Sequence, residues 1–339
     1  MTDHKEAIID MLTKLAKVNM QKRENFKANA YKKAAAQLAV VPKITKLEDI
    51  NGIPRIGKAI KEKIGHVISG NTELIKDLHM NETEKGVFKA KEVFMNIWGV
   101  GSAKAELLVK GGILTIEDLK KAVAENPDIL TANQKTGLKY FDDIEKKIPR
   151  KEMLKHEDEI SLRIDRCLAA IGIKDSEFQF HVSGSYRRGA KQSGDIDVLV
   201  SYNPAEMPPK ISNDDLLAHI IGCTIDRDCI IKNRPYMAET LTLGNKKFMG
   251  ICRLKNHRVY RRIDIMVIPP EQYPFALLYF TGSKEHNIKM RKVALEKGYS
   301  LNEYGFTKTR DSVPNIPKLS TEREIFEFIG VPYIDPIHR

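Results

Sequence analysis

Two aspartates beside a glycine-flanked basic turn are the residues of this chain best suited to chemistry. In segment 178–200 an alternating apolar run ends at Gly184-Ser185, and a second apolar run begins with Asp195 and Asp197. Residues two apart on a strand point to the same face of a sheet. The spacing therefore predicts paired carboxylates next to a turn that suits phosphate, which is the simplest way to hold divalent metal beside a triphosphate.

A third carboxylate is expected from a later strand. The alternating run 259–268 contains Asp264 and is the right kind of element to pair beside the first two aspartates. Asp195 and Asp197 can bridge two ions roughly 3.5–4 Å apart, while Asp264 completes the ion that activates an attacking 3′-hydroxyl and can take its proton. Gly-Asp-x-Asp alone also occurs in surface turns. Combined with the upstream Gly-Ser and the later strand, it is typical of nucleotidyl transfer on a mixed sheet.

The composition is that of a globular protein with a polyanionic partner. The 339 residues include 56 Lys and Arg against 45 Asp and Glu, a net charge of +11. Nucleic acid is the commonest partner of so basic a chain, and a merely basic surface is the alternative. The cysteines lack metal-binding spacing and indicate reduced, packing thiols: Cys167, Cys223, Cys229 and Cys252. No apolar run nears ~18 residues and the first residues lack a signal-peptide core, so we expect neither a membrane span nor secretion.

A turn motif that suits phosphate occurs twice in the N-terminal half. Segment 47–64 joins two expected helices through a turn with Gly52, Pro54 and Gly57, and segment 94–108 repeats the pattern with Gly99 and Gly101. Such a helix-hairpin-helix turn presents backbone N–H groups and a helix N-terminus to a phosphate in any sequence. These turns also serve as plain connectors. Residues 1–66, however, carry 14 Lys and Arg against 7 Asp and Glu, and two copies favour two contacts with a DNA backbone.

The remaining pattern predicts an α+β protein of several domains. Helices are expected over 23–41, 116–123, 131–145 and 152–171, with a boundary at 149–150. Further strands are expected at 238–243 and 247–254. Residues 276–339 have the pattern of a smaller α/β unit that ends in a helix over 321–329.

Over its whole length the chain resembles the family X DNA polymerases, the DNA polymerase beta family. The matching segments are GSYRRGAKQSGDIDVLV, KFMGIC, RRIDI, LLYFTGS, LEKGYSLNEY and GLKYFDDIEKKIPRKEM. The resemblance implies a helical 5′-deoxyribose-phosphate lyase and single-strand-binding domain at 1–83, and a helical duplex-binding subdomain with the second hairpin at 84–152. It implies a catalytic palm with a nucleotidyltransferase-type sheet at 153–270 and a nascent-base-pair-binding α/β subdomain at 271–339.

The resemblance also implies roles for single residues. Asp195, Asp197 and Asp264 match the family's triad, which holds two Mg²⁺ ions. The family's triphosphate contacts fall on Arg150, Ser185, Arg188 and Gly194. The other nucleotide and template contacts fall on Tyr279 and Phe280 at the sugar 2′ position, Gly282 at the turn that follows, Asn287 at the incoming base and Arg291 near the template strand. By residue type alone, Tyr279 and Phe280 would be core residues and Asn287 a helix-surface residue.

A second activity implied by the resemblance depends on Lys63. A neutral lysine amine can attack the C1′ aldehyde of an abasic sugar to form a Schiff base, and β-elimination then frees the 5′-deoxyribose phosphate. The resemblance places Lys27 and Tyr31 in this pocket, and Lys58 and Lys61 are further neighbouring cations that would favour the neutral amine. Without the resemblance, Lys63 has the pattern of a solvated helix residue. The family also binds Na⁺ or K⁺ through backbone carbonyls of both hairpin turns, here those of Asn51, Ile53 and Ile56 and of Met95, Ile97 and Val100.

Several positions depart from the family pattern. Phe26 stands in place of a lyase-pocket histidine. Arg55 stands in place of the first glycine of the first hairpin turn, where it either alters the turn or adds a phosphate contact. Met266 replaces an arginine that switches partners during closure, so we expect looser gating and lower fidelity. Lys284 and Ile288 replace residues that stack near the nascent base pair, which affects discrimination there.

The expected function is gap-filling DNA synthesis in base excision repair, with 5′-deoxyribose-phosphate lyase activity. The expected partners are gapped or nicked duplex DNA, deoxynucleoside triphosphates and unspecified repair proteins, bound by a monomer without a membrane. The expected location is the nucleus, or the cytoplasm for a chain of viral origin. Two alternatives stay open: a template-independent nucleotidyltransferase, which the two hairpins disfavour, and a non-enzymatic DNA-structure-binding protein, which the three aspartates disfavour.

Overall fold

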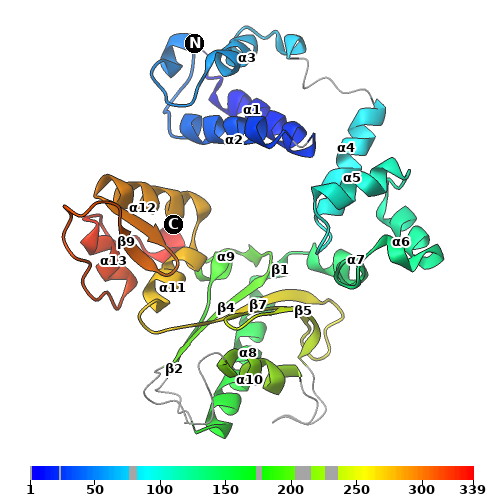
Figure 1. The fold of residues 1–339 in the computed structure, drawn as a ribbon, viewed down its shortest axis with the longest axis vertical. Coiled ribbons are helices and arrows are strands. Elements are labelled where there is room, and N and C mark those ends of the chain that lie inside the picture. The colour runs from blue at the N-terminus through cyan, green and yellow to red at the C-terminus, as the bar shows by residue number, and fades with distance from the viewer. Residues whose placement is uncertain (1, 23, 76–81, 173–177, 203–214, 226–235) are drawn as a thin grey trace. The chain divides into compact units, whose positions relative to one another are not determined.

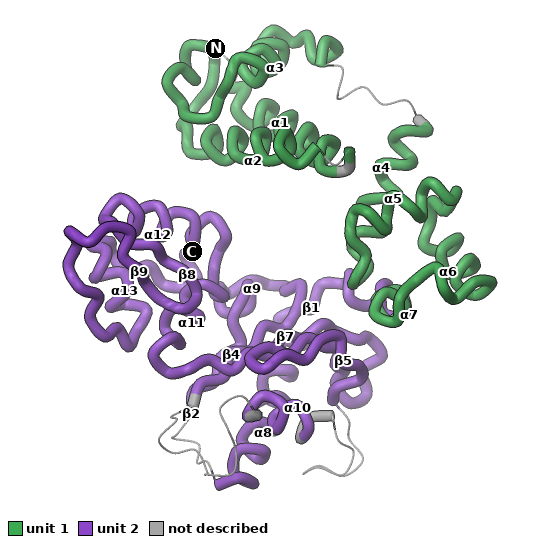
Figure 2. Tube along the Cα trace, in the orientation of Figure 1, with its two compact units in different colours: residues 1–138 green, residues 139–339 purple. Residues whose placement is uncertain are grey.

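The chain folds into two compact units. A computed structural model describes residues 2–22, 24–75, 82–172, 178–202, 215–225 and 236–339. The units span residues 1–138 and 139–339 (Figure 2). The expected multidomain α+β class is confirmed, and the expected four-part division at 83, 152 and 270 stays a prediction. Among the described residues no helix is long and apolar enough to span a membrane.

The first unit is made of helices. Its first part holds α1 (Lys5–Gln21), α2 (Asn25–Ala39), the 3-10 turn η1 (Leu47–Ile50), α3 (Lys58–Ile68) and η2 (Thr72–Leu74). Ile8, Leu12 and Leu15 lie on one face of α1 and are fully buried, as three- and four-residue spacing requires. The helix expected to end near Asp49 is only the short turn η1. The carboxylate of Asp49 accepts hydrogen bonds from the backbone of Thr45 (2.7 Å) and Lys46 (3.1 Å), which closes this segment into a turn.

The second part of this unit contains the second hairpin. It holds α4 (Glu82–Met95), α5 (Ser102–Lys110), α6 (Ile116–Glu125), the 3-10 turn η4 (Pro127–Ile129) and α7 (Ala132–Ile144), which continues into the second unit. Phe94 and Ile97 are buried at 0% and 1% exposure on the apolar side of the turn. Thr115 caps α6 by accepting a hydrogen bond from the backbone of Asp118.

A five-stranded mixed sheet forms the centre of the second unit (Figure 1). Its strands, in spatial order, are β2 (Phe178–Val182), β4 (Ile196–Tyr202), β7 (Arg261–Ile268), β6 (Lys247–Cys252) and β5 (Met237–Leu243). Only β4 and β7 run parallel; the other neighbours are antiparallel. The short strands β1 (Ile148–Pro149) and β3 (Gln192–Ser193) form a separate ladder, and α9 (Gly184–Arg187) follows β2.

Strand alternation divides the sheet into an apolar face and a face with carboxylates. On one face, Val198, Val200 and Ile265 pack against α8 (Arg150–Ala170) and α10 (Asp215–Ile225), which lie together beside the sheet in Figure 1. The next residues of β4 and β7 point the other way. Leu199 and Met266 there pack against α11 (Tyr273–Thr281). Asp197 and Asp264 therefore lie on the α11 face.

The C-terminal part packs around its own aromatic core. It contains α11, α12 (Lys284–Glu296), β8 (Tyr299–Asn302), β9 (Gly305–Lys308), α13 (Glu322–Phe328) and the 3-10 turn η7 (Pro336–His338). Tyr299, Phe306 and Phe328 meet with ring centroids 4.9–6.0 Å apart. Helix α13 begins with a capping box in which Thr321 and Glu324 exchange hydrogen bonds.

Of the four cysteines, two lie within the described side chains. Cys167 and Cys252 are buried in the core against the sheet, as expected of packing cysteines. The expectations for Cys223 and Cys229 lie outside the described side chains.

Candidate active site

Two carboxylates face each other across the parallel pair of strands. Asp197 on β4 and Asp264 on β7 are direct register partners, so their side chains leave the sheet on the same face. Asp264 is 4% exposed. Asp195 lies in the bend just before β4 rather than on the strand. Its position near the other two carboxylates is therefore set by this bend and not by the alternation of side chains along the strand.

Two cations contact these carboxylates. Arg262 lies two residues before Asp264 on β7 and therefore on the same face; its guanidinium pairs with Asp195 and lies 3.2 Å from Oδ1 of Asp264. The Nζ of Lys247 on β6 lies 3.0 Å from Oδ2 of Asp264. Arg262 and Lys247 were not assigned roles from the sequence, although the i, i+2 rule applied to Asp264 would have found the first.

Burial makes the negative charges of Asp197 and Asp264 unfavourable. Burial, and then repulsion by Asp264, raise the pKa of Asp197 to about 6, although Lys247 and Arg188 act in the opposite direction. Gly184 closes in on the same side chain: a Cβ added there would lie 2.6 Å from Oδ2 of Asp197, and its φ of +60° also favours glycine. The backbone therefore approaches Asp197 as closely as a glycine allows.

The donor set fits divalent metal ions in its chemistry. Within the described ranges, no group of three or more His, Cys, Asp or Glu side chains is already arranged as a metal site. Instead, Arg262 and Lys247 supply the positive charge that Asp195 and Asp264 need. Carboxylate oxygens are the ligands that Mg²⁺ prefers, and a buried carboxylate with a raised pKa gains most from a nearby cation. Asp195, Asp197 and Asp264 are the residues that would hold it.

A cleft of about 540 Å³ opens beside these carboxylates. It brings together nine of the positions expected at the site: Ser185, Arg188, Asp195, Asp197, Tyr279, Phe280, Gly282, Asn287 and Arg291. Gly184, Lys284 and Ile288 complete its wall together with Ser283. Asp264 lies deeper, next to Asp197.

The residues expected to contact the triphosphate make contacts within the protein. Arg188 donates from Nη1 to the carbonyl of Thr281 at 2.5 Å, and Ser185 donates from Oγ to Oγ of Ser193 at 3.1 Å. Arg150 lies away from the cleft wall, since it donates to the carbonyl of Tyr186 at 2.8 Å and stacks over that ring. Gly194, at the bend before Asp195, also lies outside the wall.

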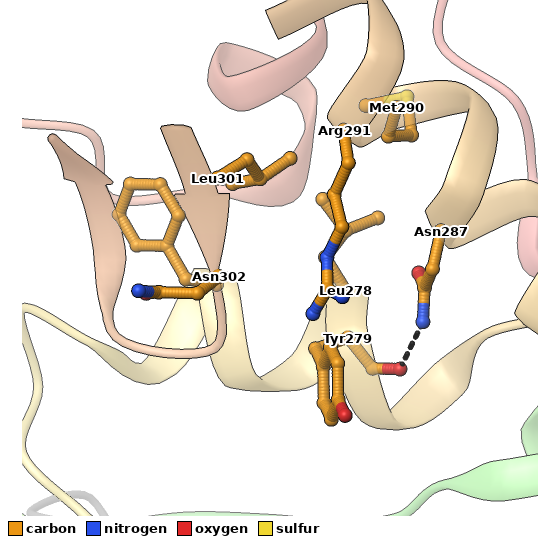
Figure 3. A pocket seen from close by; sticks show the side chains of 8 residues that line it. Leu278, Tyr279, Asn287, Met290, Arg291, Leu301 and Asn302 are labelled. Carbon is orange, nitrogen blue, oxygen red and sulfur yellow. Dashed lines mark hydrogen bonds between the residues drawn. The ribbon is translucent and has the colours of Figure 1, made fainter. Parts of the chain in front are cut away.

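Helices α11 and α12 contribute other residues of the cleft wall. Figure 3 shows Asn287 pointing at the carbonyl of Tyr279, to which its Nδ2 donates at 2.7 Å. The guanidinium of Arg291 lies 5.1 Å from the centre of the Tyr279 ring and 4.0 Å from a carboxylate oxygen of Glu303. The ring of Tyr279 in turn meets Phe280 edge to face at 5.0 Å. This wall is a set of mutually oriented planar groups.

Met266 lies beneath the site rather than in it. It is 4% exposed and packs among Leu199, Tyr273 and residues of α11. The position that breaks the family pattern is therefore a packing contact between the sheet and the wall of the cleft.

The expected lyase residues lie in the first unit. Lys63 is half-buried on α3, Lys58 is exposed at the start of that helix, and Lys27 is exposed on α2, where it pairs with Glu24 at 2.6 Å. Tyr31 is buried in the core of this part of the unit. Phe26, at the beginning of α2, is 89% exposed.

The two hairpin turns have similar backbone angles where they lead into the following helix. Helices α3 and α5 each follow a glycine with extended backbone, Gly57 and Gly101. The side chains of Ile56, Ile97 and Val100 are buried at 7%, 1% and 6% exposure, so these residues anchor the turns. Of the carbonyls expected to bind a cation, that of Ile97 accepts from the backbone N–H of Val100 at 2.9 Å. Asn51 is exposed, and its side-chain oxygen accepts from Lys61 at 3.1 Å, while Ile53 and Met95 are half-buried.

Comparisons with known proteins point to DNA polymerases in every part of the chain that they match. Family models match in sequence: a helix-hairpin-helix domain over 3–73, the fingers domain of DNA polymerase lambda over 92–145, the DNA polymerase beta palm over 147–270 and the DNA polymerase beta thumb over 276–339. DNA polymerase lambda of Arabidopsis thaliana is 31% identical over 344 residues, which cover 98% of this chain and 61% of that protein.

Two further relatives are more distant. DNA polymerase lambda of Rattus norvegicus is 27% identical, covering all of this chain and 56% of that protein. DNA nucleotidylexotransferase of Xenopus laevis is 26% identical, covering 91% and 63%. The chain thus spans less than two thirds of the length of these relatives. Because all four models match consecutive segments along its length, the chain belongs to the family X DNA polymerases.

Proposed function

We propose that this chain is a template-directed DNA polymerase that fills gaps in duplex DNA during base excision repair. The observation that carries the proposal is the register pairing of Asp197 and Asp264 at a cleft whose wall includes Arg188 and Asn287. Two relatives named DNA polymerase lambda support it. The substrates proposed are deoxynucleoside triphosphates and gapped or nicked DNA.

The residues of the cleft divide the chemistry between them. Mg²⁺ ions held by Asp195, Asp197 and Asp264 would neutralise charge on the attacking and leaving oxygens. Arg188 and Ser185 would hold the triphosphate, with pyrophosphate as the leaving group. Asp264, deepest in the site, would accept the proton of the attacking 3′-hydroxyl.

Two wall residues would select the nucleotide. Asn287 would read the edge of the incoming base, and its bond to the carbonyl of Tyr279 fixes where it points. The ring of Tyr279 would lie against the sugar.

Extension of a primer across a one-nucleotide gap tests this proposal, with the four nucleotides offered singly. We expect insertion only of the nucleotide complementary to the template, and its loss in Asp197→Ala. The Xenopus relative named DNA nucleotidylexotransferase makes template-independent transfer the second candidate. Insertion without regard to template would favour that candidate. DNA binding without insertion of any nucleotide would leave a non-enzymatic binding protein.

We propose, in addition, 5′-deoxyribose-phosphate lyase activity from Lys63. The support is its half-buried position on α3, in the unit matched by the helix-hairpin-helix model, with Lys58 at the start of the same helix. Borohydride should trap a covalent complex with an incised abasic site in the wild type. Trapping should disappear in Lys63→Ala and persist in Lys14→Ala, a variant of a lysine on α1. Undiminished trapping in Lys63→Ala would move the nucleophile to another lysine.

The remaining expectations are also proposals. A monomer predicts one light-scattering mass with and without substrate, and a nuclear enzyme predicts nuclear fluorescence of a tagged chain. Na⁺ or K⁺ at the hairpin carbonyls predicts tighter binding of DNA in potassium chloride than in tetramethylammonium chloride of equal ionic strength. Equal affinity in both salts would remove the monovalent sites.

A further inference from the structure

The two hairpin turns place different residues at the same backbone position. Arg55 and Gly99 each lie two residues before the glycine that precedes a helix, and both have positive φ, +69° and +79°. The flanking glycines match as well: Gly57 has φ −76° and ψ 172°, and Gly101 has φ −91° and ψ 176°. At these two positions the first turn has backbone angles like those of the second, but it carries a long cationic side chain where the second has none.

This conformation is unfavourable for arginine. Among the described residues, Arg55 and Asn256 alone combine a side chain with positive φ, and asparagine tolerates that region far better. A glycine at position 55 would avoid the cost, as Gly99 does in the second turn. Strain of this kind commonly accompanies a functional role.

The second turn leaves little room for a side chain at Gly99 itself, although a Cβ at Gly101 would meet nothing within 4 Å. At Gly99 a Cβ would lie 3.3 Å from Cγ of Gln134, and Nε2 of Gln134 donates to the Gly99 carbonyl at 2.8 Å. In the first turn, a Cβ at Gly52 or at Gly57 would meet nothing within 4 Å. Arg55 itself is exposed.

The guanidinium of Arg55 is available to a ligand. No hydrogen bond or ion pair joins it to any described part of the chain. Segment 52–63 carries Arg55, Lys58, Lys61 and Lys63 against one carboxylate, Glu62, so the turn has an excess of positive charge. A guanidinium presents paired N–H donors that match two oxygens of one phosphate.

We propose that Arg55 is a DNA-phosphate contact of the first hairpin, additional to the backbone N–H groups that such a turn offers. The proposal rests on the proposed function, because it takes DNA to be the ligand. Arginine at this position has an unfavourable backbone conformation but adds a charged contact that the second hairpin lacks.

The test is the affinity for a fluorescent duplex with a one-nucleotide gap, measured from 50 to 200 mM salt. Arg55→Gly and Arg55→Asn should weaken binding roughly tenfold at the lower salt and reduce the slope of log affinity against log salt by about 0.9, the change for one phosphate contact. Both residues suit positive φ, so the melting temperature should equal or exceed that of the wild type. Lys14→Gln on α1, which removes the same charge, should leave the slope unchanged.

Wild-type affinity and slope in both Arg55 variants would overturn the proposal, as would an equal change in Lys14→Gln. Weaker binding accompanied by a lower melting temperature would assign Arg55 a structural role and overturn it too. The assay needs no nucleotide insertion. Binding that depends on Arg55 in a chain that inserts no nucleotide would therefore refute the polymerase and keep this contact.

Discussion

A buried ion-pair network should hold the C-terminal part of the second unit to α9. Arg187 donates twice to Glu322, at 2.6 and 3.1 Å, and once to Oγ1 of Thr281 at 2.7 Å. Arg339 donates to the same carboxylate at 2.5 Å. The side chains of Glu322 and Arg339 are 6% and 0% exposed and that of Arg187 is 18% exposed, so one buried carboxylate compensates a buried and a partly buried guanidinium group.

Replacing Glu322 by Gln keeps the shape but removes the charge. The buried guanidinium of Arg339 and the partly buried one of Arg187 then lose their counter-ion, which costs about 3–5 kcal/mol of unfolding free energy. For a unit of this size, residues 139–339, that loss lowers the melting temperature by about 6–20 °C. Differential scanning calorimetry of the full chain measures it. Glu327→Gln, an exposed carboxylate on the same helix, is the matched control and should melt like the wild type.

The pH dependence of this difference follows from the pKa of Glu322. Burial alone raises this pKa, but hydrogen bonds from Arg187 and Arg339 outweigh it and hold the pKa below its ordinary value of 4.5. A carboxylate with a depressed pKa stabilises the fold fully above its unfolded pKa and loses that contribution as the pH falls through its folded pKa. The gap between wild type and Glu322→Gln should therefore be full at pH 7 and shrink below pH 4.5. A Glu322→Gln variant within 1 kcal/mol of wild type at pH 7 would refute this reasoning.

The other predictions concern nucleotide selection. Met266→Arg should lower misinsertion at a one-nucleotide gap, since an arginine on the Asp197 and Asp264 face can pair with those carboxylates while the site is open. Met266→Leu is the control. Unchanged misinsertion in the arginine variant would count against the gating hypothesis. Tyr279→Ala should raise the ratio of ribonucleotide to deoxyribonucleotide insertion roughly tenfold, because the ring would no longer crowd the sugar. Phe275→Leu, behind that wall, should leave the ratio unchanged, and an unchanged ratio in Tyr279→Ala would remove the ring from sugar discrimination.

The parts of this structure that sequence could predict are those governed by short-range periodicity. The alternation of apolar residues predicted that Asp197 and Asp264 lie on strands. The spacing of glycines between two helical segments predicted both hairpin turns. Asp195 was predicted on the strand but lies in the bend before it, because β4 begins at Ile196. The parallel register that makes the two aspartates partners depends on the whole sheet, and no local pattern contains it.

Polar contacts between residues far apart in the sequence could not be predicted from local patterns. Arg187 and Glu322 are far apart in sequence, and each alone has the pattern of a solvated charge. Met266 was recognised as a departure from the family, but its burial against α11 depends on which helix covers that face of the sheet. Such contacts are decided by packing between elements, which spacing along one element does not encode.

The central claim is that Asp197 and Asp264 together perform metal-dependent nucleotidyl transfer. Its most direct test is single-turnover insertion into a one-nucleotide gap by Asp264→Asn, measured while Mg²⁺ is titrated, with Asp143→Asn as a control outside the cleft. We predict that Asp264→Asn lowers the insertion rate by about 10³-fold or more at every Mg²⁺ concentration, while DNA affinity is retained. A rate within tenfold of the wild type at saturating Mg²⁺ would contradict the account.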